Sequence, residues 1–273
     1  MKIRIISDLH TDVNEEFDIS WKNKNLLTVI AGDIAGSLAD TKKFLRAKLN
    51  NVIFIAGNHM VYNYESKPIQ LLYQDLKDEF PIDSNIAFLQ DSYKEIDDVV
   101  FIGATLWTDF SYNNGMFNKG DSKETITEIN MKIAKECMND YKWGSYLSKD
   151  GMLVSFEPYH CQIMFRDSLK FIKKTYDKFA DSKKKIVLIV HHGISPQILG
   201  RGYTHDELAA EYITDLESYI KTKMPKLSLI IHGHIHTSYA YKIGGVSVIC
   251  NARGYIDHGL KNTDFNKDLT IDI

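Results

Sequence analysis

The sequence predicts an α/β fold in which a parallel or mixed β-sheet is covered by helices. Two observations predict it. Short apolar runs typical of buried strands alternate along the 273 residues with longer segments that carry an apolar face at helical spacing. Several of the apolar runs end directly in a loop that contains Asp, Asn or His. Such loops meet at one edge of a parallel sheet, so this edge is the expected site.

The first elements repeat one pattern three times: an apolar strand followed by polar residues. Strands are expected at residues 2–7, 26–31 and 51–56. They run into Asp8-Leu9-His10, Gly32-Asp33 and Gly57-Asn58-His59, respectively. Ser37 is expected to cap a helix that ends near Leu49. A second helix is expected over residues 66–80, because apolar side chains there share one face.

The middle of the chain is expected to hold strands at residues 86–89 and 99–104, followed by an Asn- and Gly-rich loop over 106–120. Asp121 with Glu124 resembles a capping box for a helix that ends near Met138. The buried face of that helix is expected to consist of Ile126, Ile129, Ile133 and Cys137. Another helix with an apolar stripe is expected to begin at Pro158.

The last elements repeat the strand-and-loop pattern. A strand at 185–190 ends in His191-His192-Gly193, and Thr204 with Glu207 resembles a capping box for a helix that ends near Lys221. A strand at 227–231 precedes the sequence HGHIH. Residues 239–243 and 246–250 flank two glycines, which indicates a hairpin, and a final strand is expected at 269–273.

The chain is organised around the stretch 227–236, in which a short apolar run leads into closely spaced histidines. Gly233 is expected to let the backbone turn sharply after the strand. In extended backbone, residues two apart point to the same side, so His234 and His236 would face one site. Imidazole is a common ligand of zinc, manganese, iron and nickel. Taken alone, the stretch fits a surface histidine cluster equally well.

Composition narrows the range of partners. A net charge of −3 argues against a broad nucleic-acid-binding surface, so no obligate nucleic-acid partner is expected. A small phosphorylated substrate stays compatible with it, because bound metals supply positive charge. The three cysteines are far apart and are expected to be buried free thiols in a reducing compartment. No signal peptide or membrane-spanning run is recognised, so we expect a cytoplasmic protein. The oligomeric state is left open.

Histidines concentrate in the loops that follow strands. Seven of the ten lie there: His10, His59, His191, His192, His232, His234 and His236. Together with two aspartates and an asparagine, they suit manganese, iron or zinc better than magnesium or calcium alone. The set is too large for one tetrahedral zinc, so two metal ions are expected. Two-metal sites suit the hydrolysis of phosphate esters.

The motifs D-x-H, GD, GNH, H and GHxH occur in this order along the chain. Their order resembles that of the calcineurin-like metallophosphoesterases. The resemblance covers nearly the whole chain. It implies a four-layer α/β/β/α sandwich with two mixed β-sheets. It also implies a single domain over residues 1–273, with a substrate-facing insert around 107–160.

The resemblance assigns a role to each motif residue. Asp8, His10 and His236 would hold the first metal ion. Asn58, His191 and His234 would hold the second, and Asp33 would bridge the two. A hydroxide that bridges the ions would attack the phosphorus. His59 would stabilise the transition state or protonate the leaving group.

The implied activity is a dinuclear-metal-dependent phosphoesterase that acts on a small phosphate mono- or diester. Manganese is the first choice of metal, with iron, zinc and nickel as alternatives. Two other functions are weighed: a non-catalytic metal-binding scaffold of the same fold, and a nuclease. The motif residues are all present, which disfavours the scaffold, and the acidic net charge disfavours the nuclease.

Several residues near the motifs are secondary candidates. His192 is a candidate substrate-binding residue beside His191, and Arg253 is a candidate phosphate clamp, with a structural ion pair as its alternative. Arg201 is a weaker candidate for the same task. Met60 stands where the family often has an acid after GNH, so His59 lacks that partner. Asp109 is considered as a substitute, but the composition around it favours a loop-capping role.

Overall fold

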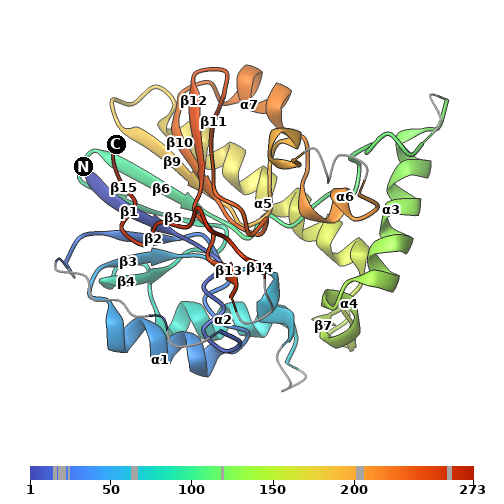
Figure 1. Cartoon of the computed structure of the whole chain (residues 1–273), viewed down its shortest axis with the longest axis horizontal. Helices are drawn as coiled ribbons and strands as arrows, with labels where there is room; N and C mark the ends of the chain where they lie inside the picture. Colours follow the sequence, from blue (N-terminus) through green and yellow to red (C-terminus); the bar gives the residue numbers. More distant parts are fainter. Residues whose placement is uncertain are drawn as a thin grey trace.

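Two β-sheets face each other at the centre of the fold (Figure 1). The computed structural model describes residues 1–14, 17, 23, 25–62, 67–117, 120–200, 206–256 and 260–273. In this part of the chain the first sheet has the strand order β15–β1–β2–β3–β4. These strands span Thr270–Asp272, Lys2–Ile6, Thr28–Ile30, Val52–Phe54 and Ile86–Phe88, respectively. The sheet is mixed, because β15 runs antiparallel to β1 and the other neighbours are parallel.

The second sheet is also mixed. Its order is β11–β12–β10–β9–β6–β5. These strands span Tyr239–Ile243, Val246–Cys250, Leu227–His232, Lys185–Ile189, Val99–Gly103 and Ser92–Ile96, respectively. The four central strands are parallel, and the edge strands β11 and β5 pair antiparallel with their neighbours. The hairpin at residues 239–250 is confirmed, whereas β5 was not predicted.

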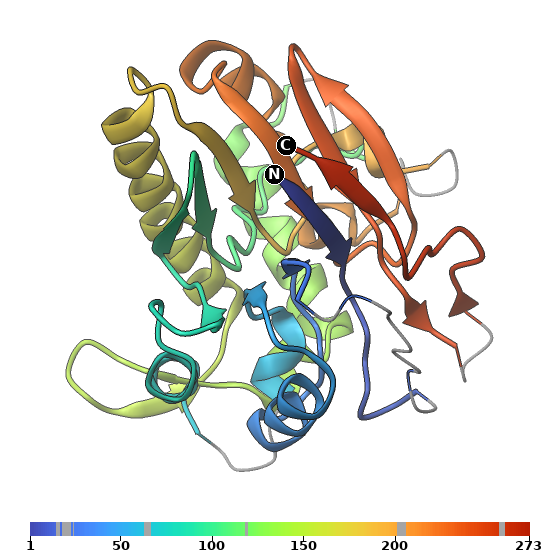
Figure 2. The same cartoon turned by 90° about the vertical axis from the view of Figure 1, so that its left-hand side faces the viewer.

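Apolar side chains fill three layers of core. Ile5 and Val29 of the first sheet meet Val187 and Ile231 of the second in the layer between the sheets. The outer face of the first sheet packs against α1 (Leu38–Lys48) and α2 (Ile69–Glu79). The outer face of the second sheet packs against α5 (Pro158–Phe179) and α7 (Glu217–Lys223). This arrangement confirms the expected α/β/β/α sandwich (Figures 1 and 2).

Two helix starts agree with the sequence and one does not. Ser37 caps α1 by accepting a hydrogen bond from the backbone N–H of Asp40, and α5 begins at Pro158. The helix α3 (Lys123–Cys137) is capped by Ser122, so the capping box expected at Asp121 is wrong.

The buried face of α3 also differs from the expected one. Asn130 is buried because its amide donates to the carbonyl groups of Phe110 and Tyr112. These bonds turn the helix so that Ile126, Asn130 and Ala134 face inward. Ile129 and Cys137 are exposed, so their expected burial is wrong. The other two cysteines, Cys161 and Cys250, are buried free thiols as expected.

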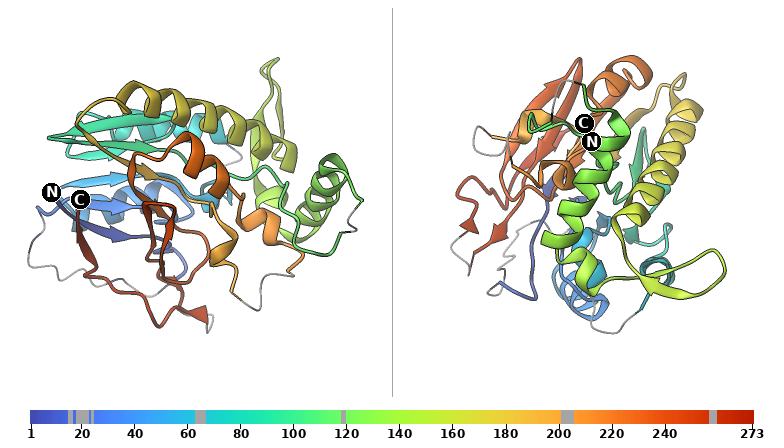
Figure 3. Two further views of the ribbon diagram at one scale, coloured as in Figure 1. Left: turned by 90° about the horizontal axis from the view of Figure 1, so that it is seen from above. Right: turned by 90° about the vertical axis from the view of Figure 1, so that its right-hand side faces the viewer.

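The segment 107–160 forms one end of the molecule. It contains α3, α4 (Asp140–Trp143) and a hairpin of β7 (Ser145–Leu147) and β8 (Leu153–Ser155). The two chain termini lie side by side at the opposite end (Figure 3). The short elements α4, β7 and β8 were not predicted, because their few residues carry no clear periodicity.

The single helix expected up to Lys221 is wrong. The structure has α6 (Ala209–Tyr212) and, after a break, α7. The break occurs because Gly193 donates to the carbonyl of Tyr212 and accepts from the N–H of Thr214, which ties the chain to the loop after β9. Thr204 and Arg201 lie outside the described residues, as does Ser66 at the expected start of α2.

Four short elements complete the described part of the chain. They are η1 (Asn58–Tyr62), η2 (Pro196–Ile198), β13 (Gly254–Tyr255) and β14 (Leu260–Lys261). Of these, η1 follows β3, and β13 follows β12. No helix in the described ranges is long and apolar enough to cross a membrane.

Candidate metal centre

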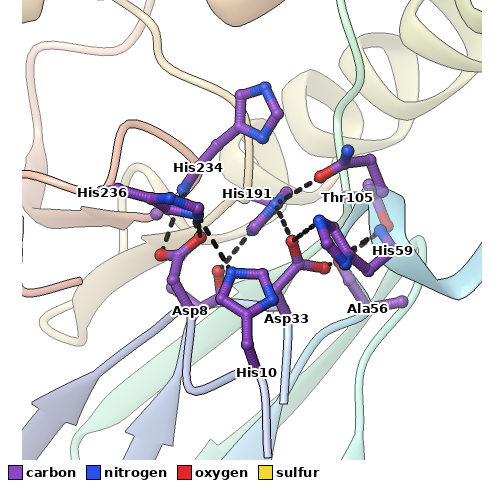
Figure 4. A network of polar contacts seen from close by, with 12 residues as sticks. Asp8, His10, Asp33, Ala56, His59, Thr105, His191, His234 and His236 are labelled. Atoms are coloured by element: carbon purple, nitrogen blue, oxygen red, sulfur yellow. Dashed lines mark hydrogen bonds and ion pairs between the residues drawn. The ribbon is translucent and has the colours of Figure 1, made fainter. Parts of the chain in front are cut away.

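The motif residues gather where the parallel strands of both sheets end. Asp8 and His10 follow β1, Asp33 follows β2, and η1 begins with Asn58 after β3. The second sheet contributes residues that follow β9 and β10: His191, His234 and His236. The strand-end placement agrees with the prediction, and Figure 4 shows the side chains of His10, His191 and His236 around the carboxylates of Asp8 and Asp33.

Asp8, His10 and His236 form one group. The Nε2 atoms of His10 and His236 are 3.0 Å apart, and the Nε2 atom of His236 is 3.6 Å from Oδ1 of Asp8. One candidate ligand atom from each residue lies within 4.8 Å of those of the other two. Asp8 and His10 are fully buried, so three ligand atoms converge on a small volume with little access to water.

Asp33 lies between two further groups. It combines with His10 and His59 in one, and with Asp8 and His191 in the other. The Nε2 atom of His191 is 3.3 Å from Oδ2 of Asp33 and 3.1 Å from Oδ1 of Asn58. Asp33, Asp8 and His10 each belong to two of the three groups, so the groups overlap and form one continuous cluster of candidate ligands.

His234 contacts the site through its backbone N–H, whereas its ring lies outside the close groups of candidate ligands. Its N–H donates to both carboxylate oxygens of Asp8, at 2.9 and 3.1 Å. The centroid of its ring is 5.1 Å from that of His191. In Figure 4 the ring points away from the carboxylates of Asp8 and Asp33. The structure therefore brings His234 to the site without placing it in any of the three close groups.

The donor atoms fit divalent transition-metal ions. Among the buried side-chain atoms that lack a hydrogen-bond partner in the described part of the chain, three belong to the proposed ligands: Oδ2 of Asp33, Nδ1 of His10 and Nε2 of His234. Buried polar atoms are normally paired, so unpaired ones concentrated at one place indicate a missing partner. Carboxylate, amide and imidazole atoms together are the ligands that manganese, iron and zinc accept.

Protonation at the site is set by burial and by the two carboxylates. Burial lowers the pKa of His10 and of His234 well below the usual value, so both imidazoles are neutral. Burial acts in the same direction on His191, but the charges of Asp33 and Asp8 outweigh it and raise its pKa to about 9. A cation that binds here would displace the proton of His191.

Two glycines allow the close approach of the carboxylates. A Cβ atom on Gly57 would lie 2.0 Å from Oδ1 of Asp33, and one on Gly233 would lie 2.5 Å from Oδ2 of Asp8. The left-handed turn after β10 is made by His234, with φ of 71°, and not by Gly233. The expectation that Gly233 provides the turn is therefore wrong. Its hydrogen side chain is needed for space.

Strained backbone is concentrated in the site. Five motif residues have left-handed φ angles between 44° and 71°: Asp8, His10, Asp33, His234 and His236. Non-glycine residues adopt this region at a cost of roughly 1–2 kcal/mol each. Such strain persists where the surrounding structure enforces it, and it is typical of functional sites.

A cavity of about 670 Å³ opens over the group. Polar lining comes from nine residues: Asp33, Asn58, His59, His234, His236, Thr237, Asn262, Thr263 and Asp264. Apolar and aromatic lining comes from Tyr62, Met138, Ile198, Leu199, Tyr212, Ile235 and Tyr255. No Lys or Arg occurs among the described residues that line it. Among the side chains of this described lining, only the imidazoles can become cationic.

Tyr255 is a partner of His59 that the sequence did not reveal. Its hydroxyl is 2.6 Å from Nε2 of His59. Met60, which stands where the family often has an acid, is buried. Asp109 caps its own loop, because it accepts hydrogen bonds from the N–H and the hydroxyl of Ser111. Tyr255 and His59 are 196 positions apart in the sequence, so no local motif links them.

The two secondary candidates do not line the cavity. His192 is fully buried, and its ring centroid is 4.4 Å from that of His234. Arg253 donates to the carbonyl of Leu9 and lies over the ring of Phe17, 4.7 Å from its centroid. Neither residue is among the described residues that line the cavity, and substrate binding by His192 or Arg253 stays a prediction.

Comparison with known proteins gives matches over most of the chain. The family model of the calcineurin-like phosphoesterases matches residues 1–238. A protein of Acanthamoeba polyphaga mimivirus, described as uncharacterised, is 26% identical over 305 aligned residues, which cover 99% of this chain and 96% of the viral protein.

Two solved structures share the fold. Phosphopantetheinyl hydrolase from Mycobacterium tuberculosis superposes with a TM-score of 0.65 and 19% identity, over 93% of this chain and 89% of that chain. A dimetal phosphatase from Danio rerio superposes with a TM-score of 0.52 and 14% identity, over 94% of this chain and 88% of that chain.

Proposed function

Because the chain belongs to the calcineurin-like phosphoesterase family, we propose that it uses two divalent transition-metal ions to hydrolyse a phosphate mono- or diester. The observation that carries this proposal is the overlap of three groups of candidate ligands, in which Asp33, like Asp8 and His10, belongs to two. The family is metal-dependent, and the unpaired buried atoms of the site support a requirement for metal.

The contacts support an assignment of ligands. Asp8, His10 and His236 would hold one ion, and Asn58, His191 and His234 the other. Asp33 would contact both. When bound, the two ions would generate a nucleophile from water and neutralise the charge of the phosphate. Manganese is the first choice of metal, and iron, zinc and nickel suit the same donor atoms.

His59 is the residue we assign to proton transfer or to stabilisation of the transition state. It lines the cavity, and its Nε2 atom bonds to the hydroxyl of Tyr255. Its backbone N–H donates to Oδ1 of Asp33 at 3.1 Å, which fixes the residue beside the carboxylate. An imidazole held in this way at the wall of the cavity can reach a leaving group.

The cavity favours a small phosphorylated substrate. Its volume of about 670 Å³ suits a small molecule, and its apolar wall suits an organic leaving group. Met138 brings the segment 107–160 to this wall, which supports a single domain over residues 1–273 in which this segment is a substrate-facing insert. A lining without Lys or Arg in its described part disfavours nuclease activity, because nucleic-acid grooves are basic.

An activity panel tests the function. We expect manganese-loaded protein to hydrolyse p-nitrophenyl phosphate or bis-p-nitrophenyl phosphate, and to lose this activity in a chelator. Cyclic nucleotides, phosphopeptides and oligonucleotides complete the panel. If manganese, iron, zinc and nickel each bind but none supports hydrolysis of any substrate, the protein is a scaffold. Cleavage restricted to oligonucleotides, with binding that weakens steeply as salt increases, would identify a nuclease.

The number of ions is a separate prediction. Protein purified without chelator should contain close to two transition-metal ions per chain, because the proposed ligands divide into two sets that share Asp33. Elemental analysis measures this content directly. A single ion at saturating manganese would contradict the dinuclear mechanism, while leaving a mononuclear hydrolase possible.

A further inference from the structure

We propose that Tyr62 and Asp140 are positioning residues that hold the Asn58 amide with its oxygen toward His191. The inference rests on the proposed role of Asn58 as a metal ligand. A chain of hydrogen bonds carries it. The Nδ2 atom of Asn58 donates to the hydroxyl of Tyr62 at 3.3 Å, and this hydroxyl donates to Oδ2 of Asp140 at 2.8 Å.

The direction of each bond fixes the orientation of the amide. The hydroxyl of Tyr62 has one proton, which it gives to Asp140. Its oxygen can then only accept, so Asn58 must present its NH₂ group to Tyr62. The carbonyl oxygen of the amide is thereby turned to the opposite side, where it lies 3.1 Å from Nε2 of His191.

This orientation matters because the two ends of an amide have nearly the same shape and opposite chemistry. The oxygen of Asn58 can bind a cation, whereas its NH₂ group cannot. A rotation of the amide by half a turn would cost little in packing and would remove one ligand. Asn58 and Asp140 are buried, so a broken link would also leave polar groups without water.

Asp140 connects the insert to the ligand set. It is the first residue of α4, in the segment 107–160, and lies 78 positions from Tyr62 in the sequence. Tyr62 lines the cavity and belongs to η1, as Asn58 does. The insert therefore supports the site from behind, in addition to its proposed place beside the substrate.

The first experiment is a calorimetric titration of the metal-free full chain with Mn²⁺. In Tyr62→Phe we expect the affinity of one of the two sites to fall about 10–100-fold, the usual effect of losing a residue that supports a ligand. The other site should stay within about twofold of the wild type. The control is Tyr176→Phe, which removes another hydroxyl that bonds in the protein interior, here to the N–H of Lys226, and should change neither site.

A second background separates orientation from packing. In Asn58→Asp both ends of the side chain are oxygens, so no orientation has to be selected. Adding Tyr62→Phe to this background should lower Mn²⁺ affinity much less than it does in the wild type. A residue that acts only through packing would cost the same in both backgrounds, because independent effects add.

Variants of Asp140 test the other end of the chain. Asp140→Asn keeps the shape and an acceptor for Tyr62, so it should retain most of the Mn²⁺ affinity. Asp140→Leu keeps the approximate shape without an acceptor and should reproduce the loss seen in Tyr62→Phe. Circular dichroism shows whether each variant is folded, and Asp140→Leu provides the test if Tyr62→Phe is not.

The outcomes distinguish this inference from the proposed function. If the wild type binds two Mn²⁺ ions and Tyr62→Phe behaves like Tyr176→Phe, the positioning role is wrong and the proposed function stands. Equal weakening of both sites would also overturn it, because only one of the two contains Asn58. A wild type that binds none of Mn²⁺, Fe²⁺, Zn²⁺ and Ni²⁺ would overturn the proposed function and this inference with it.

Discussion

Replacing Asp33 by asparagine should lower phosphoesterase turnover roughly 10²-fold or more, since even residues that only support metal ligands cost 10–100-fold when lost. The carboxylate of Asp33 is buried and belongs to two overlapping ligand groups, so its charge serves both proposed ions. An amide keeps the shape and one oxygen but removes that charge. Turnover at limiting Mn²⁺, with Mn²⁺ content measured in parallel, reports the effect.

The fold should survive this change. Asparagine tolerates the left-handed φ of 49° found at Asp33. The change removes a carboxylate whose charge raises the pKa of His191, so we expect the temperature of unfolding of the metal-free protein to fall without loss of the fold. The matched control is Asp97→Asn, an exposed position with φ of 52°, which should leave turnover unchanged. Near-normal turnover of Asp33→Asn at limiting metal would show that Asp33 does not bridge two ions.

His59→Ala should lower turnover roughly 10²–10⁴-fold, the span typical of a general acid or base, while the metal content stays near two ions per chain. The metal content should persist because the contact between His59 and Asp33 that we expect to matter uses the backbone N–H, which alanine retains. If His59 protonates the leaving group, the loss should be smaller for p-nitrophenolate than for an alkoxide. Steady-state rates on an aryl and an alkyl phosphate measure this difference.

Each alternative role of His59 has a distinct signature. Equal losses on both esters indicate electrostatic stabilisation of the transition state. Loss of an ion would make His59 a ligand, which its position in one of the close groups permits. Tyr255→Phe removes the partner of Nε2 without touching the imidazole. If Tyr255 holds His59 for proton transfer, this change should lower turnover less than His59→Ala does. The loss should again be greater on the alkyl ester than on the aryl ester.

The parts of the site that sequence predicted are the parts carried by local motifs. A strand followed by Asp8-Leu9-His10 or by Gly57-Asn58-His59 can be recognised from a few residues, because the strand and its loop are contiguous. The residues that support these motif residues could not be predicted. Tyr255 contacts His59 across 196 positions, and Asp140 contacts Tyr62 across 78. Partners at such distances are selected by the tertiary fold, which no local pattern records.

The fold shows the same division. Long apolar strands and the helix from Pro158 follow from periodicity, whereas the four-layer arrangement was implied only by the family resemblance. Predictions from local periodicity were wrong where a hydrogen bond to a distant part of the chain determined the structure. Asn130 turned α3 away from its most apolar face, and Gly193 interrupted the helix expected up to Lys221. In both cases a buried backbone or amide group had to be paired, which outweighed helical preference.

The bond between His234 and Asp8 has a consequence for synthesis of the chain. It joins residues 226 positions apart, so the carboxylates of Asp8 and Asp33 leave the ribosome long before the residues that will surround them. Until β10 and the loop after it have been translated, the emerging polypeptide carries part of a chelating cluster without His234 and His236. A divalent cation captured at that stage would be held by an incomplete and solvent-exposed set of donors. Correct metal loading is therefore expected after translation of the second sheet.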